Sequence, residues 1–310
     1  MSGTVSTPWD LRGLGSTGRP GGLLFGRMHE DAAVDGLALA GARRIFAIAS
    51  AGDTALRLAA AGLHVTAVDV HPAQVAYVRR RAMGGAPARG RIDRLLTLVR
   101  LAGAAAGCTR RALRAFLLLD DPEAQAATWD SLLGTWRCRA LLAAGFSPAV
   151  LRLAYAEPFA SMLPRPFGQH LHARLRAGFA AHPNRGNPYA WQLLIGEDPP
   201  GHSEPRRPAA GTLTVERAEA AAFLEAQPAG SFDGFTLSNI LDGPDQAYAR
   251  RLAGAVRHAG RPSAPVVLRT LRSPRDGDEA RWARRDRSLI WGAVVVTSAQ
   301  DLPARVEWSR

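Results

Sequence analysis

The chain has 310 residues, of which 47% are hydrophobic, so it can bury the core of one large α/β domain or of two modest ones. No apolar run of about 18 residues is free of charge, so no transmembrane helix is predicted, and residues 1–20 lack the charged start and apolar stretch of a secretory signal. The two cysteines, Cys108 and Cys138, give neither a disulfide framework nor a metal-binding CxxC spacing. A reducing cytoplasm is therefore the expected compartment.

The chain is strongly basic, with a formal net charge of +12, and arginine supplies the basic side chains because lysine is absent. A GC-rich genome explains this composition without any functional partner, and an anionic partner is the alternative. The clustered arginines do not form one stripe with aromatic residues; examples are Arg79–Arg81, Arg110–Arg111, Arg206–Arg207, Arg250–Arg251 and Arg284–Arg285. We expect no nucleic-acid partner, and an arginine-rich nucleic-acid-binding protein remains the alternative outside the enzymes.

The first predicted elements form a β-α-β-α unit. Residues 43–50 predict a short buried strand, 53–61 a helix with one apolar face, and 64–70 a second strand. A second helix is expected from Pro72, which the first turn of a helix tolerates, to about Met83. Such a unit opens a doubly wound parallel sheet.

The pattern changes after this unit. Residues 90 to about 180 predict helices, broken near Pro122, Pro148 and Pro164, and 182–211 predict a loop rich in Pro, Gly and Asn. Further strands are expected at 231–240, 264–271 and 289–297, with a helix at 244–258. The sequence thus predicts a single α/β domain over 1–310, with a mostly helical insertion and substrate-side loop at about 86–230.

The turn after the first strand has the small residues that a nucleotide-like ligand requires. Ser50, Ala51 and Gly52 let a ligand approach the backbone, and the following helix, from Asp53, points its N-terminal N–H groups at that ligand. Asp69, at the end of the second strand, can hold both hydroxyls of a ribose. Small residues in such a turn can also be purely structural, and Asp69 can instead cap the next helix.

Five segments resemble the family of S-adenosylmethionine 3-amino-3-carboxypropyltransferases related to the betaine-lipid synthesis enzyme. They are FGRMHED at 25–31, IASAGDTAL at 48–56, AVDVHPAQ at 67–74, HPNRGNPY at 182–189 and FDGFTLSNI at 232–240. Two features depart from the family: His29 stands where a tryptophan is usual, and the chain is shorter than the lipid-acting members. Both departures bear on the acceptor more than on the cofactor.

The resemblance implies a Rossmann-like fold of the class I methyltransferase type, with S-adenosylmethionine as co-substrate. It also implies transfer of the 3-amino-3-carboxypropyl arm to a hydroxyl, with methylthioadenosine leaving. The favoured acceptor is a small phenolic natural product, as in the related transferases that act on nocardicin. The alternative acceptor is a diacylglycerol-type lipid, and an enzyme that acts on it would contact a membrane surface. An ordinary methyltransferase on the same fold is the alternative reaction.

Such an enzyme must hold the amino acid end of the cofactor firmly. Arg185 is the first candidate to bind the carboxylate, because guanidinium binds carboxylate with two parallel hydrogen bonds, and Arg27 is its rival. Glu30 and Asp31 can bind the ammonium group, activate the acceptor, or simply cap a helix that starts there.

The remaining candidates have more general roles. His29 and His182 can act as bases, and Tyr189 can cover the adenine or bind the acceptor. Ser238 and Asn239 lie at the carboxyl end of a predicted strand, where α/β folds bind ligands. The residues predicted to be catalytic are His29, Glu30, Asp31, His182 and Tyr189. The residues predicted to bind the cofactor are Ser50, Ala51, Gly52, Asp53, Asp69, Val70, Arg185, Ser238 and Asn239. His170 and His172 lack a spaced carboxylate partner, and no metal is expected.

Overall fold

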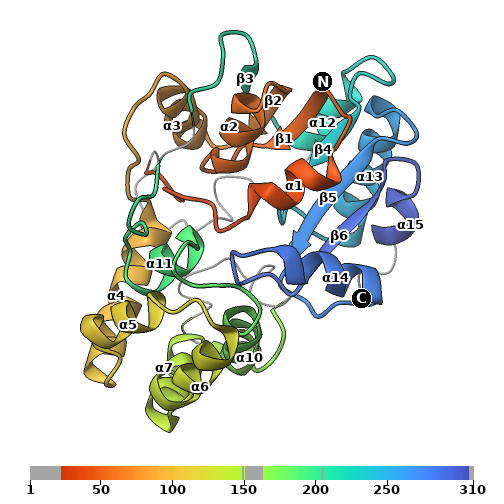
Figure 1. Cartoon of the computed structure of the whole chain (residues 1–310). Helices are drawn as coiled ribbons and strands as arrows, with labels where there is room; N and C mark the ends of the chain where they lie inside the picture. Colours follow the sequence, from red (N-terminus) through yellow and green to blue (C-terminus); the bar gives the residue numbers. More distant parts are fainter. Residues whose placement is uncertain (1–21, 149, 151–162, 204–205, 307–310) are drawn as a thin grey trace.

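A six-stranded sheet organises the chain in the computed structural model, which describes residues 22–148, 150, 163–203 and 206–306 (Figure 1). The strand order is β3-β2-β1-β4-β5-β6, with β6 antiparallel to β5 and the other pairs parallel. The strands are β1 (Arg44–Ile48), β2 (His64–Asp69), β3 (Leu213–Arg217), β4 (Gly234–Thr236), β5 (Pro265–Thr270) and β6 (Ala293–Ser298). The chain reverses its direction of winding between β1 and β4.

Helices cover both faces of the sheet. One face is packed by α1 (Ala32–Ala38), α2 (Asp53–Ala60), α3 (Pro72–Ala82) and α14 (Gly277–Arg285). The other face is packed by α12 (Ala220–Glu225), α13 (Gln246–Ala259) and α15 (Leu302–Val306). The domain is therefore an α/β domain with a mostly parallel sheet between two helical layers.

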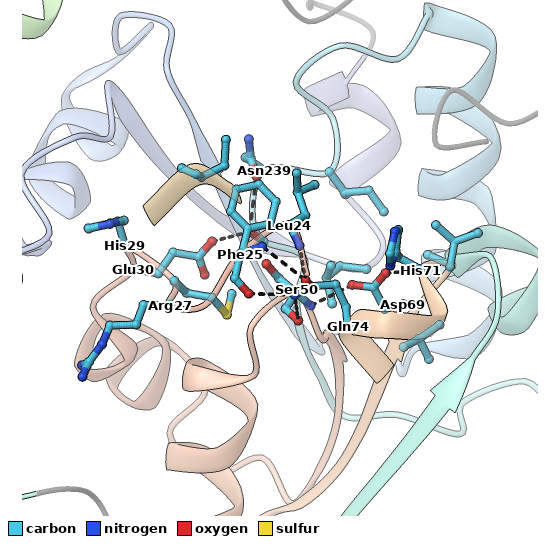
Figure 2. A pocket seen from close by; sticks show the side chains of 18 of the residues that line it. Leu24, Phe25, Arg27, His29, Glu30, Ser50, Asp69, His71, Gln74 and Asn239 are labelled. Carbon is cyan, nitrogen blue, oxygen red and sulfur yellow. Dashed lines mark hydrogen bonds between the residues drawn. The ribbon is translucent and has the colours of Figure 1, made fainter. Parts of the chain in front are cut away.

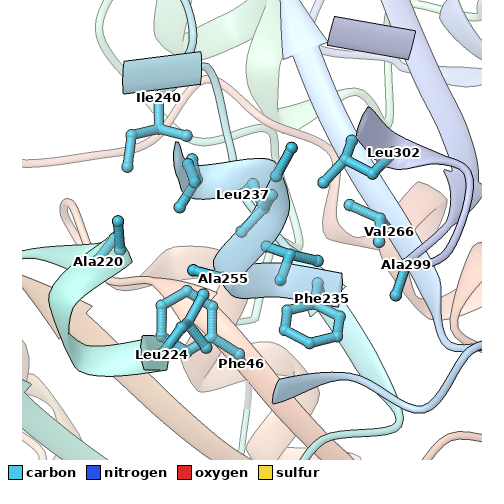
Figure 3. Packing of buried hydrophobic residues seen from close by; sticks show 14 of the residues in the cluster. Phe46, Ala220, Leu224, Phe235, Leu237, Ile240, Ala255, Val266, Ala299 and Leu302 are labelled. Atoms are coloured by element: carbon cyan, nitrogen blue, oxygen red, sulfur yellow. The ribbon is translucent and has the colours of Figure 1, made fainter. Parts of the chain in front are cut away.

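Alternation along the strands explains the two layers. In β1, Ile45 and Ala47 pack with α1 and α2, whereas Phe46 faces the opposite layer. Figure 3 shows Phe46 close to Leu224 of α12, with Phe235 nearby under α13. Both sides of the central strands are apolar because both are covered, as parallel sheets require.

A group of helices separates β2 from β3. It contains α4 (Arg91–Ala105), α5 (Arg110–Leu117), α6 (Pro122–Leu132), α7 (Trp136–Gly145), α10 (Phe167–Phe179) and α11 (Pro188–Leu194). These helices share their own apolar core, in which Trp129, Phe116 and Phe179 lie ring against ring. Figure 1 shows this group, orange to green, beside the sheet rather than over it.

Several predicted elements are confirmed, within a few residues at their ends. They are the strands at 43–50, 64–70, 231–240, 264–271 and 289–297, the helices at 53–61, Pro72–Met83 and 244–258, and the helical character of 90–180 outside the undescribed residues 149 and 151–162. The prediction that residues 1–20 lack a secretory signal lies outside the described residues. Among the described residues, no helix combines the length and the apolar character that a bilayer span needs.

Five elements of the described ranges were not predicted: the strand β3 and the helices α11, α12, α14 and α15. The loop expected at 182–211 contains α11, which Asn187 starts by accepting hydrogen bonds from the N–H groups of Tyr189 and Ala190, with Pro188 at the first helical position. The same residues gave the segment its loop-like composition. The strand β3 and the helix α12 lie inside the range 86–230 that was predicted as a mostly helical insertion, so the group of helices ends earlier, at α11. β3 was not predicted because Val215 is its single buried residue, which leaves no apolar pattern.

Candidate functional site

A cavity of about 310 Å³ opens at the carboxyl ends of the strands, where the winding reverses. This is the position at which open α/β sheets bind ligands, and the volume is in the range of small-molecule sites. Residues that end or follow β1 to β4 line it: Ser50, Asp69, Val70, His71, Glu219, Ser238 and Asn239. Figure 2 shows Arg27, His29 and Glu30 on one side of this cavity and Asp69 and His71 on the opposite side, with Ser50 between them.

The small-residue turn after β1 is shaped for close approach. Ser50 has φ 45° and Gly52 has φ 88°, both in the left-handed region. A Cβ added to Gly52 would lie 2.9 Å from the side chain of Val78, so only glycine fits there. Ser50 lines the cavity, while Ala51 and Gly52 lie behind it and support the turn.

Backbone strain concentrates around the cavity. The three non-glycine residues with positive φ in the described ranges are Ser50, Ser238 and Leu289. The first two line the cavity, and Leu289 precedes the lining residues Ile290 and Trp291. Strain of this kind costs about 1–3 kcal/mol per residue and gathers at functional sites.

Asp69 ends β2 with its carboxylate on the cavity wall. One oxygen accepts from the Ser50 N–H at 3.0 Å and the other from the His71 N–H at 2.8 Å, which fixes its orientation. Burial raises the pKa of Asp69 to about 6, against the effect of these two hydrogen bonds. Each oxygen keeps a lone pair for a ligand hydroxyl.

The segment from Leu24 to Glu30 forms a wall of the cavity and is tied to the turn by buried side chains. Gln74 accepts from the N–H groups of Leu24 and Phe25 and donates to the carbonyl oxygen of Ser50 at 2.7 Å. Asp53 accepts from the Met28 N–H at 2.7 Å. Asp53, a predicted cofactor residue, lies outside the lining and anchors this wall.

Asp53 also changes the character of the α2 N-terminus. It is the first residue of α2 and forms an ion pair with Arg81 at 2.9 Å. Helix N-termini that bind phosphate leave their N–H groups open to the anion. Here the Asp53 side chain instead joins the start of α2 to Met28 and Arg81.

Glu30 is a buried carboxylate on the opposite side from Asp69. It accepts hydrogen bonds from the hydroxyls of Ser238 and Thr54, and it lies 3.8 Å from a guanidinium nitrogen of Arg269. Burial raises the pKa of Glu30 to about 7, despite the opposing attraction of Arg269. A group with this pKa can hold a cation or exchange a proton near neutrality.

Arg269 is the centre of a buried charge cluster. This fully buried side chain of β5 pairs with Asp35 at 2.7 Å and with Asp286 at 2.8 Å, besides its weaker contact with Glu30. Arg269 thus pairs with three buried carboxylates, and Arg174 and Arg287 also attract Asp286. When it is ionised, the Glu30 carboxylate can attract a positively charged group on its side of the cavity.

Asp31 lies next in sequence to Glu30 but faces away from the cavity. It caps α1 by accepting from the Ala33 N–H and pairs with Arg287 through distances of 2.5 and 2.9 Å. Burial alone would raise the pKa of Asp31, but the hydrogen bonds from Arg287 bring it below its usual value. The hydroxyl of Tyr189 donates to Asp31 at 3.4 Å, and neither residue lines the cavity.

The HPNRGNPY segment braces the helical group. Asn184 donates to the carbonyl of Phe116, and its own carbonyl accepts from the indole N–H of Trp191. Arg185 is largely exposed and pairs with Asp120 at 2.7 Å. Like Arg185, His182 is not part of the lining, and burial lowers the pKa of its imidazole.

Two arginines line the cavity instead, Arg27 and Arg91. Arg27 also contacts Asp198 at 3.3 Å. His29 lies beside them; burial lowers its pKa, and its Nδ1 is buried without a hydrogen-bond partner.

Comparison with protein-family models, with curated proteins and with solved structures finds no match to the chain. Within the described ranges, no group of three or more His, Cys, Asp or Glu is arranged to hold a metal ion.

Of the predicted residues, the cavity thus brings together His29, Glu30, Ser50, Asp69, Val70, Ser238 and Asn239. Gln74 and Arg91, which line the cavity, and Arg269, which contacts Glu30, were not predicted from the sequence. A signal existed for Arg269, since a lone arginine in the buried run Val-Val-Leu-Arg-Thr requires a buried partner. Gln74 gave no signal, because a glutamine in the first turn of a helix is ordinary.

Proposed function

We propose that this chain binds S-adenosylmethionine in the cavity and transfers its 3-amino-3-carboxypropyl arm to a hydroxyl of an acceptor, releasing methylthioadenosine. The observation that carries the proposal is the pair of carboxylates, Asp69 and Glu30, on opposite sides of a cavity at the switch point of the sheet. S-adenosylmethionine has a ribose at one end, a cationic sulfonium and ammonium at the other, and no phosphate. The turn after β1 has one glycine, Gly52, rather than the three of a pyrophosphate-binding loop, which fits a ligand without phosphate.

In this proposal Asp69 accepts hydrogen bonds from both ribose hydroxyls, since its orientation is already fixed by two backbone N–H groups. The adenine lies against the apolar side chains of Val70 and Ala218. The finer fold assignment, to the methyltransferase type of Rossmann-like sheet, is part of the same proposal. It is supported by the strand order and by the antiparallel last strand.

The amino acid end of the cofactor lies on the side of Arg27, His29 and Glu30. Arg27 replaces Arg185 as the residue proposed to bind the carboxylate, with Arg91 as a second cation, because both line the cavity. The ionised carboxylate of Glu30 stabilises the sulfonium and the ammonium. Ser238 keeps the Glu30 carboxylate in place through its hydroxyl.

Transfer is a displacement at the γ-carbon of the methionine moiety. The acceptor oxygen forms a bond to this carbon, the carbon–sulfur bond breaks, and its electron pair neutralises the sulfonium as methylthioadenosine leaves. Glu30, with a pKa of about 7, accepts the proton that the hydroxyl releases. The enzyme then selects the γ-carbon over the methyl group through positioning alone.

The choice of arm transfer over methyl transfer rests on the sequence resemblance. The apolar lining near the wall segment, which includes Phe25, Ile92, Ile290 and Trp291, favours an aromatic acceptor such as a phenol. A diacylglycerol-type lipid is the second acceptor class, and a cytoplasmic location fits either.

Product analysis tests the reaction. The chain is incubated with S-adenosylmethionine and a panel of phenols and diacylglycerols, and the nucleoside products are separated. Methylthioadenosine in amounts equal to the alkylated acceptor supports the proposal. S-adenosylhomocysteine as the product would instead establish methyl transfer, and the Glu30→Gln variant shows whether either activity depends on this pocket.

A further inference from the structure

Two buried cysteines in the helical group lie side by side. Cys108 follows α4 after a turn, and Cys138 belongs to the first turn of α7, 30 positions along the chain. Their Sγ atoms are 2.7 Å apart, and the side chains are 4% and 5% exposed. Each sulfur also approaches the carbonyl oxygen of Leu132, at 3.6 and 3.7 Å, so the sulfurs are closer to each other than to this acceptor.

We propose that Cys108 and Cys138 form an intramolecular disulfide that cross-links the end of α4 to the start of α7, when a small-molecule disulfide oxidant is present. With oxidised glutathione, one thiolate attacks the oxidant to give a mixed disulfide and one reduced glutathione. The second thiolate then displaces the other glutathione. The two cysteines lose two protons and two electrons, which convert one oxidised glutathione into two reduced glutathione molecules.

The local structure favours this bond over other fates of the two thiols. The pair lies inside the apolar core of the helical group, next to Leu113 and Trp129, where a polar oxidised cysteine would be costly. Burial and the neighbouring sulfur raise the pKa of the Cys108 thiol to about 12, so the thiolate is scarce and oxidation of the folded chain is slow. Reaction therefore requires local opening, and the buried bond, once formed, is shielded from reductant.

The cross-link closes a loop that contains α5 and α6. It also fixes the far end of α4, whose first residues, Arg91 and Ile92, line the candidate site. A loop of this size restricts the unfolded chain considerably. We expect the oxidised form to unfold at a temperature higher by about 5 °C or more than the reduced form.

The test is equilibration of the full chain in glutathione buffers of graded ratio, started from both the reduced and the oxidised protein. Remaining thiols are then blocked in denaturant with a maleimide and counted by mass spectrometry. The expected result is a monomer with no maleimide, two mass units lighter than the reduced chain. Two maleimides at every ratio, glutathione adducts alone, or disulfide-linked dimers would each overturn the proposal.

Variants separate the bond from general effects of the oxidant. The double variant Cys108→Ser/Cys138→Ser should show the same unfolding temperature in reduced and oxidised buffer, whereas the natural chain shows the increase. If this variant fails to fold, Cys138→Ala alone serves, since it retains Cys108 and cannot form the internal bond. An oxidised natural chain that unfolds at the same or a lower temperature than the reduced chain contradicts the proposal.

Discussion

Replacement of Glu30 by glutamine should stabilise the protein at pH 8 relative to pH 4.5, while it slows transfer. In the folded chain the pKa of Glu30 is raised from 4.5 to about 7, chiefly by burial. Folding therefore favours the protonated form, and Glu30 contributes most to stability below pH 4.5. That contribution is lost as the pH rises to 7, because the carboxyl group must ionise in a buried place.

The magnitude follows from the shift. A difference of about 2.5 pKa units corresponds to about 3 kcal/mol at 1.36 kcal/mol per unit. The free energy of unfolding of the Glu30→Gln variant, relative to the natural chain, should therefore rise by up to about 3 kcal/mol between pH 4.5 and pH 8. Transfer should fall by about 100-fold or more, the usual contribution of a general base.

Urea denaturation of both proteins at several pH values measures this difference, and an unchanged m-value shows that the comparison is valid. Glu279→Gln is the matched control. Burial alone would raise the pKa of Glu279, but hydrogen bonds from Arg272 and the Arg275 N–H lower it, so this substitution should destabilise the protein near neutral pH. If the free energies of unfolding of Glu30→Gln and of the natural chain differ by the same amount at pH 4.5 and at pH 8, the raised pKa of Glu30 is refuted.

Three further predictions concern the cavity. Arg27→Ala should weaken S-adenosylmethionine binding about 10-fold or more, the value of a charge-assisted hydrogen bond, whereas Arg185→Ala should leave the Kd unchanged; equal effects would refute the reassignment of the carboxylate site. Gly52→Ala should lower the free energy of unfolding by about 3 kcal/mol, because alanine is strained in the left-handed region and its Cβ would contact Val78. Gly62→Ala is the control, since Gly62 has φ 93° but open space around it, and should lower the free energy of unfolding by only about 1 kcal/mol. Equal losses in the two variants would show that the Val78 side chain moves aside. Affinity for S-adenosylmethionine should increase between pH 6 and pH 8 as Glu30 ionises, and an affinity that falls over this range would exclude Glu30 as the partner of the sulfonium.

The central sheet could be predicted because its signals are local. The strands β1, β2 and β5 are short apolar runs between turn residues, and the helices α2 and α3 begin where the sequence supplies Asp53 and Pro72. Asp69 could be predicted to face a ligand because it is the acidic residue that ends β2, which is also a local signal, and it lines the cavity. Strand β3 could not be predicted, because an edge strand with one buried residue shows almost no alternation of apolar and polar residues.

The side-chain partners across the site could not be predicted, because they join segments far apart in the chain. Arg269 meets Asp35 and Asp286 through tertiary packing alone. Arg185 also shows the effect of packing: its motif suggested a ligand contact, whereas its loop packs on the helical group and its guanidinium pairs with Asp120. Local sequence thus indicated which loops end at the sheet edge but not which way each side chain faces.

A calorimetric titration measures directly whether the cavity binds S-adenosylmethionine. The natural chain should bind one S-adenosylmethionine, and S-adenosylhomocysteine more weakly because it lacks the sulfonium charge. Asp69→Asn should weaken binding about 10- to 100-fold by removing one charged acceptor of the ribose, whereas Asp130→Asn on the exposed face of α6 should not. The absence of heat from the natural chain, or an affinity that Asp69→Asn leaves unchanged, would contradict the assignment of this cavity to S-adenosylmethionine.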